Sequence, residues 1–271
     1  YRQFLLAPDT PESELVSKVA LKLGGAKGGS LLEEIWKDID AAIKDNHGNL
    51  GFGLGTEFAS RRTLVRPLVP DAPALLPEER DYWLRYTFSG YQRFGAAHLF
   101  RGEGGTPLPE WYSKNLEQSA RARDAFQKSS QSLQNFIKMN PDETSKYPYL
   151  VDHKRQLRFL GYVYATGASL YEGQALLDKY SKKNIEEAIK QDMDADIKRF
   201  EELVRNEIIN TREFIKFLND GGDIGMALLP EETTWAYSDY LHVLLEKKID
   251  IMQRHLPEIK EVLNRWFNSE Y

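Results

Sequence analysis

The sequence predicts an all-α protein: a multi-helix bundle built around one long central helix, with a Gly/Pro/Arg-rich irregular segment near residues 49–77. Three observations predict this fold. One stretch of 35 residues carries an unbroken helical pattern of apolar side chains, and further stretches with the same spacing are separated by Gly and Pro. Residues 49–80 alone form a long segment without helical spacing. The sequence therefore determines the fold class better than the function.

The central helix is predicted at residues 184–218. No Gly or Pro interrupts this stretch before Gly221, and at about 1.5 Å per residue it would be roughly 52 Å long. Its apolar side chains share one stripe of the helix: Ile185, Ile189, Met193, Ile197, Phe200, Val204, Ile208, Ile215 and Leu218. Its charged side chains share the other face: Glu186, Lys190, Asp194, Lys198, Glu201 and Arg205. Such a helix must bury its stripe against other helices.

The N-terminal residues predict two helices packed as an antiparallel hairpin. Thr10 followed by Pro11 is typical of a helix start, and this helix is expected to run to Leu23 and to stop at Gly24-Gly25. Ser30 with Glu33 forms a capping-box pattern that starts a second helix. The glycine-rich stretch between them suggests phosphate binding at a helix N-terminus, but it lacks the Walker spacing and a preceding strand. We therefore interpret it as a turn between helices.

The irregular segment carries three arginines, Arg61, Arg62 and Arg66, among glycines and prolines. It has two functional interpretations, a loop that faces a ligand or an arm that wraps onto a neighbouring domain. The alternative is a connector whose arginines face solvent or pair with acids. Loops carry function more often than packed helices do, and a structureless link of about thirty residues is unusual in a compact domain.

An aromatic-rich helix is predicted to start at Pro77 and to carry Trp83 and Tyr86. Tyr and Trp beside arginines are typical of a surface that binds sugars or flat ligands. The same residues also fill the core face of an amphipathic helix, and we favour this core interpretation for the cluster as a whole.

The second half of the chain predicts further helices. One ends at Asn140-Pro141, another spans about Tyr149–Tyr180, and a last one starts near Ser238. Gly161 and Ala168 are small residues deep in the second of these helices, where a Gly costs about 1 kcal/mol against Ala. We expect them to admit the central helix. The predicted organisation is a hairpin, arm and aromatic helix over residues 1–110 and a long-helix bundle over residues 111–271, forming one continuous unit.

Composition excludes several classes of function. The net charge of −5 disfavours nucleic acid as a partner, and no apolar run is long enough to span a membrane. The absence of cysteine excludes disulfides and thiolate metal sites. Asp239 and His242 share a helix face, but two ligands do not make a metal site. We predict no metal, no cofactor and no catalytic residue that can be named from the sequence.

Four short stretches resemble the C-terminal helical region of certain large bacterial glycoside-hydrolase-like proteins. They are Gly51-Phe52-Gly53-Leu54-Gly55, Arg66-Pro67-Leu68-Val69-Pro70, Leu76-Pro77-Glu78-Glu79 and Lys247-Lys248-Ile249-Asp250-Ile251-Met252-Gln253-Arg254-His255. The resemblance implies that a catalytic barrel precedes the helical region and that residues 51–71 face this barrel or its substrate. The chain contains no such barrel, so the resemblance assigns no catalytic residue to it.

Two functional hypotheses follow. The first is a helical accessory domain of a larger carbohydrate-active protein, inactive alone, whose partner is the missing catalytic domain and whose location is the periplasm or the outside of the cell. The chain begins without Met, so we expect it to be a piece of something longer. The second is a self-contained helical domain or enzyme that binds a small molecule or carbohydrate through residues 52–100. Both predict one ligand-binding surface: Arg61, Arg62, Arg66, Trp83 and Tyr86.

Overall fold

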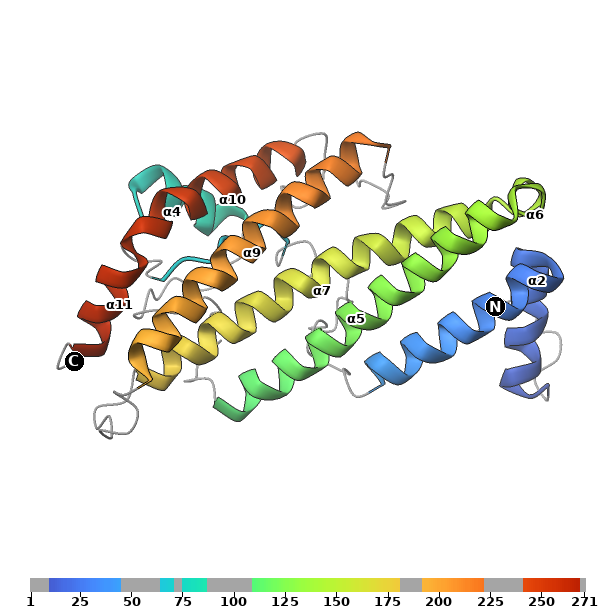
Figure 1. The fold of residues 1–271 in the computed structure, drawn as a ribbon, viewed down its shortest axis with the longest axis horizontal. Helices are drawn as coiled ribbons and strands as arrows, with labels where there is room; N and C mark the ends of the chain where they lie inside the picture. The colour runs from blue at the N-terminus through green and yellow to red at the C-terminus, as the bar shows by residue number, and fades with distance from the viewer. Residues whose placement is uncertain are drawn as a thin grey trace. The chain divides into compact units, whose positions relative to one another are not determined.

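The predicted all-α fold is confirmed. The computed structural model describes residues 10–44, 64–70, 75–86, 109–180, 192–221 and 241–268, and these contain helices and no strand. Figure 1 shows the helices along the chain. They are α2 (Glu12–Ile43), α4 (Pro77–Tyr86), α5 (Pro109–Met139), α6 (Pro141–Lys146), α7 (Tyr149–Tyr180), α9 (Met193–Asn219), α10 (Leu241–His255), the 3-10 helix η2 (Leu256–Glu258) and α11 (Ile259–Asn268).

The chain forms two compact units. In the described residues, the first unit contains α2, α5 from Arg121, α6 and α7 as far as Gly161. The second unit contains residues 64–70, α4, α5 as far as Ala120, α7 from Tyr162, and all of α9, α10, η2 and α11. Each unit thus draws residues from both sides of position 110. The predicted organisation into residues 1–110 and 111–271 stays a prediction.

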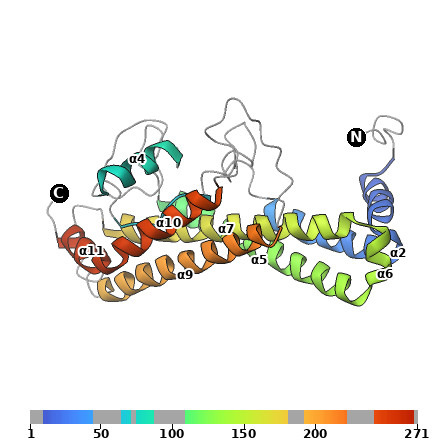
Figure 2. The ribbon, with the colours of Figure 1, turned by 90° about the horizontal axis from the view of Figure 1, so that it is seen from above.

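The predicted hairpin at the N-terminus is instead one kinked helix. Helix α2 runs through the glycine-rich stretch, and Gly25 alone leaves the helical conformation, with φ 68° and ψ −170°. Figures 1 and 2 show the two halves of α2 at an angle, not side by side. Ser30 lies inside the helix and donates to the Ala26 carbonyl, so it forms no capping box. A Cβ on Gly24 would lie 2.6 Å from the Gly29 nitrogen, and glycine therefore permits the close approach at the kink.

Small and aromatic residues hold the first unit together. A Cβ on Gly28 would lie 3.1 Å from a Leu150 methyl group, so the glycine lets α7 pack close to α2. Trp36 donates its indole N–H to His153 Nε2 at 3.0 Å. This bond requires an unprotonated Nε2, and burial lowers the pKa of His153 in agreement with a neutral ring. His153 is thus part of the packing of this unit.

The central helix is confirmed over the residues described, Met193–Asn219, while residues 184–191 lie outside them. Ile197 and Val204 are buried and Lys198 is exposed, as the periodic pattern predicted. Helix α9 packs against α10 and α11, and also against α7, where the Tyr162 and Phe214 rings are 5.2 Å apart. The prediction that this helix packs against Gly161 is wrong, because Gly161 packs against α5 instead. A Cβ there would lie 3.2 Å from Gln127 Cγ of α5, because the glycine faces that helix.

The second unit has a large apolar core that includes part of the predicted irregular segment. Residues 64–70 have a largely non-helical backbone, and the predicted start of α4 at Pro77 is confirmed. The core contains two residues of this segment together with residues of α4, α7, α9, α10 and α11. Its fully buried members with relative exposure of 0% are Leu68, Leu170, Phe200, Ile251, Met252 and Ile259.

Candidate functional site

The structure describes two of the five predicted ligand-binding side chains. Arg61 and Arg62 lie outside the described residues, and Tyr86 is the last residue of α4, with a side chain that also lies outside them. Arg66 and Trp83 both belong to the second unit. The ligand-binding role of the five residues therefore stays a prediction.

Arg66 and Trp83 contribute to the interior of the second unit. Trp83 is 5% exposed and belongs to the apolar core beside Tyr82. Arg66 is partly buried, and its positive charge acts on the pKa of the Tyr171 hydroxyl. Burial raises the pKa of Tyr171 to about 12, and the positive charge of Arg66 works against this rise. In the described structure, the Trp83 ring contributes to packing and offers little face for stacking on a ligand.

Glu207 and Lys248 form a buried ionic pair in the second unit. We use the name closed cluster for this pair together with Thr166, Thr211 and the Leu64 carbonyl. Glu207 of α9 and Lys248 of α10 are each 0% exposed, and Lys248 Nζ lies 2.5 Å from Glu207 Oε1. Burial lowers the pKa of Lys248 below its usual value, while the attraction of Glu207 opposes this effect. A charge in this position requires partners, because an isolated buried ion is very costly.

Hydroxyl groups complete the surroundings of Glu207. Thr166 of α7 donates to Glu207 Oε1 at 2.6 Å, so this oxygen accepts from both a hydroxyl and an ammonium group. Thr211 donates to the Glu207 backbone carbonyl one turn earlier, at 2.8 Å. Glu207 Oε2 has no hydrogen-bond partner within the described structure. The carboxylate therefore joins α7, α9 and α10 through one of its two oxygens.

The closed cluster also fixes the segment of residues 64–70. Lys248 donates a second hydrogen bond to the Leu64 carbonyl at 2.8 Å, 184 positions away in the sequence. The Tyr82 hydroxyl of α4 lies 2.7 Å from the Val65 carbonyl and 3.0 Å from the Leu244 carbonyl of α10. Carbonyl groups in a non-helical segment need donors from elsewhere when they are buried. Lys248 and Tyr82 supply these donors and anchor the segment to the bundle.

A second ionic group, which we name the open cluster, joins α4 to the end of α10 and to η2. It consists of Glu78, Glu79, Arg254, His255 and Glu258. Glu79 is 0% exposed, whereas Arg254 is 46% and Glu258 52% exposed. Glu79 Oε2 accepts from the Leu76 backbone N–H at 3.1 Å, which caps the N-terminus of α4, and lies 2.8 Å from His255 Nε2. Arg254 Nη1 lies 3.0 Å from Glu79 Oε1 as an ion pair without hydrogen-bond geometry.

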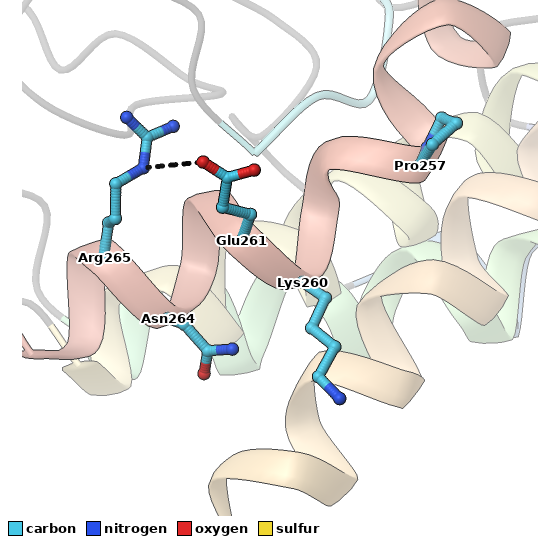
Figure 3. Close-up of a pocket in the computed structure, with 5 residues that line it drawn as sticks. All are labelled: Pro257, Lys260, Glu261, Asn264 and Arg265. Carbon is cyan, nitrogen blue, oxygen red and sulfur yellow. Dashed lines mark ion pairs between the residues drawn. The ribbon is translucent and has the colours of Figure 1, made fainter.

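A shallow hollow of about 620 Å³ lies along the C-terminal end of the chain and is open to solvent. Figure 3 shows its described lining residues, Pro257, Lys260, Glu261, Asn264 and Arg265. Glu261 and Arg265 point toward one another, 3.9 Å apart, and Lys260 points away from them. These side chains are those of an exposed helix face, and the two ionic clusters contribute none of them.

Comparison with known proteins gives no match among family models, curated proteins or solved structures. The resemblance to glycoside-hydrolase-like proteins therefore stays a prediction. Within the described ranges, no group of three or more His, Asp and Glu side chains is placed to hold a metal ion. None of the helices described here combines the length and the apolar character that a membrane span requires.

Sequence reasoning missed Glu207 and Lys248, although a signal was present. Glu207 lies three residues after Val204 and seven after Phe200, so it falls on the apolar stripe of α9. Lys248 lies three residues after Leu245 and seven after Leu241 on α10. A single acid on one buried stripe and a single base on another indicate a buried pair, because neither charge is tolerated alone.

Proposed function

We propose that the chain is a helical accessory domain of a larger carbohydrate-active protein, that it has no catalytic activity alone, and that it works in the periplasm or outside the cell. In this proposal, Arg61 and Arg62 contact an acidic carbohydrate or the catalytic domain, and the bundle holds the segment that follows them. The assignment to a carbohydrate-active protein rests on the resemblance of the four short stretches.

The observation that carries the proposal is the anchoring of residues 64–70. This segment begins two residues after Arg62 in the sequence and is fixed by Lys248 and Tyr82 at its Leu64 and Val65 carbonyls. Anchoring of a segment lowers the conformational entropy that the residues next to it in the sequence lose on binding. Arginine suits an acidic carbohydrate because its guanidinium group binds a carboxylate through two parallel hydrogen bonds.

The state of the buried ionisable groups also supports a role without chemistry. Glu207 and Lys248 are 0% exposed and pair with each other. Glu79 contacts Arg254 and His255 and accepts a hydrogen bond at the N-terminus of α4. A general acid or base must come within hydrogen-bond reach of a substrate. In the described conformation these groups fasten helices, so we assign them structural roles.

Affinity electrophoresis of the 271-residue chain tests the proposal. We expect retardation in gels that contain a uronic-acid polysaccharide, with less retardation in neutral polysaccharide. An Arg61→Ala/Arg62→Ala double variant should lose the retardation at an unchanged melting temperature. The matched control is Arg205→Ala/Arg212→Ala, which removes the same charge from exposed positions of α9 and should bind as the original chain does.

Two of the following outcomes would overturn the proposal, and the loss of all retardation would narrow it to the catalytic domain as partner. Equal loss of retardation in both double variants would indicate a general charge effect without a site. Absence of retardation in every polysaccharide would remove the carbohydrate partner. Hydrolysis of nitrophenyl glycosides by the purified chain would show that the chain is itself an enzyme.

A further inference from the structure

The imidazole ring of His255 lies between two carboxylates of the open cluster. Its Nε2 is 2.8 Å from Glu79 Oε2 on α4, and its Nδ1 is 2.8 Å from Glu258 Oε2 on η2. Ionised carboxylates only accept hydrogen bonds, and a neutral imidazole has one N–H to donate. Both contacts can be hydrogen bonds to ionised carboxylates only when the ring carries two protons. The geometry therefore fits an imidazolium ion.

The surrounding charges favour the same state. The groups of the open cluster around His255 are Glu78 and Glu79 on α4, Arg254 on α10 and Glu258 on η2. With a neutral ring, three carboxylates face one guanidinium group among the described residues, which leaves two negative charges in excess. An imidazolium ion reduces this excess to one. Because Glu79 is fully buried, water cannot replace a cationic partner that it loses. Among the three carboxylates, Glu79 is therefore destabilised most when His255 is neutral.

We propose that His255 is a pH-sensitive latch, which as an imidazolium ion fastens the N-terminus of α4 to the junction of α10 and η2 and loosens this attachment on losing a proton. Deprotonation leaves a nitrogen lone pair facing a carboxylate oxygen across one of the two 2.8 Å contacts. The Tyr82 contacts lie farther along α4 and join a tyrosine hydroxyl to two backbone carbonyls. The latch therefore acts on the first turn of α4 and leaves its anchored second half in place.

The direction of the pH effect follows from the surroundings of the ring. Burial alone would lower the pKa of His255, but its hydrogen bonds to Glu79 and Glu258 outweigh burial and raise the pKa above 6.5. A raised folded-state pKa means that the folded protein binds the proton more tightly than the unfolded chain does. The stabilisation is therefore fully present below pH 6.5 and is lost as the pH rises through the folded-state pKa.

Two measurements on the whole chain test the latch. NMR titration of the histidine Cε1–H signals should give a pKa for His255 above 6.5. Hydrogen exchange of the α4 backbone amides between pH 6 and pH 9, expressed as protection relative to the intrinsic rate, should show opening that increases through the same pKa. The expected increase in the opening constant is tenfold for each pKa unit by which His255 exceeds 6.5.

Three variants make the test specific. His255→Gln should abolish the pH dependence of α4 opening, while His242→Gln, at an exposed position of the same helix, should leave it unchanged. Glu258→Gln removes one exposed carboxylate and should move the transition to lower pH, which keeps the test available if His255→Gln does not fold. A His255 pKa at or below 6.5 would overturn the proposal, as would α4 protection that is independent of pH in the original chain.

Discussion

The closed and open clusters of the second unit both join helices through a buried carboxylate, and they differ in what surrounds the cation. In the closed cluster, Lys248 and Glu207 are both 0% exposed. In the open cluster, Glu79 is equally buried, but His255 is 12% exposed and Arg254 46% exposed. Among the residues that the structure describes, Glu207 pairs with a single buried ammonium group, whereas Glu79 contacts two cationic side chains and a backbone N–H.

This difference separates a fixed attachment from an adjustable one. Desolvation of two charges offsets most of their attraction, so the closed pair contributes little net stability compared with an apolar pair of the same shape. Because neither charge is tolerated alone in the core, the closed pair instead requires Lys248 and Glu207 to stay together. The cations of the open cluster are partly exposed to solvent, and one of them is a histidine, the residue type whose charge most readily changes with pH. We therefore expect the closed cluster to fix the arrangement of the helices and the open cluster to adjust it with pH.

The comparison assumes that charges in this core need partners, and the strongest test is a charge without one. Ile197 is 4% exposed on the same helix as Glu207. We expect Ile197→Asp to unfold the second unit, because an unpaired buried carboxylate costs several kcal/mol. Lys198→Asp, one residue away on the exposed face, should be nearly silent. Thermal melts followed by circular dichroism measure both, and equal tolerance would contradict the assignment of the inner face.

The next largest effect is expected from removing one member of the closed pair. Lys248→Met leaves Glu207 buried without its ammonium partner and should lower the free energy of unfolding by about 3–5 kcal/mol. The double variant Lys248→Met/Glu207→Leu removes both charges and should recover most of this loss. Urea unfolding of the three proteins measures the difference. If the double variant is as unstable as the single one, the two side chains stabilise the fold by more than neutralising each other's charge.

The periodic patterns predicted the helices well because burial on a helix follows a period of 3.6 residues. Ile197, Val204 and Lys198 lie as predicted for this reason. The patterns failed where the outcome depended on three-dimensional contacts. Gly25 and Gly161 both indicate tight packing, but a glycine in the sequence does not show whether the chain turns, kinks or admits a neighbour, nor which helix that neighbour is.

The ionic clusters were harder to predict than the helices for a related reason. The partners Leu64, Thr166, Glu207 and Lys248 come from four segments of the chain, and no spacing rule connects them. Arg66 and Trp83 were identified by residue type, which does not determine whether such a side chain binds a ligand or fills a core. The structure shows Trp83 in the core and leaves Arg61 and Arg62 as predictions.

The smallest expected effect comes from the substitution in the open cluster that matches Lys248→Met. Arg254→Met removes a cation that lies 3.0 Å from the buried Glu79, but Glu79 keeps its contacts with His255 and with the Leu76 N–H. Because Arg254 is 46% exposed, we expect a loss of about 0.2–1 kcal/mol in the free energy of unfolding at pH 6. The loss should shrink in 1 M salt, where the Debye length falls to about 3 Å, while the effect of Lys248→Met should change little. At a pH above the folded-state pKa of His255, where the ring is neutral, removal of Arg254 should cost more than at pH 6, because Glu79 then depends on Arg254. Urea unfolding at the two pH values measures this change, and an identical cost at both would contradict the assignment of His255 as the second cation of the open cluster.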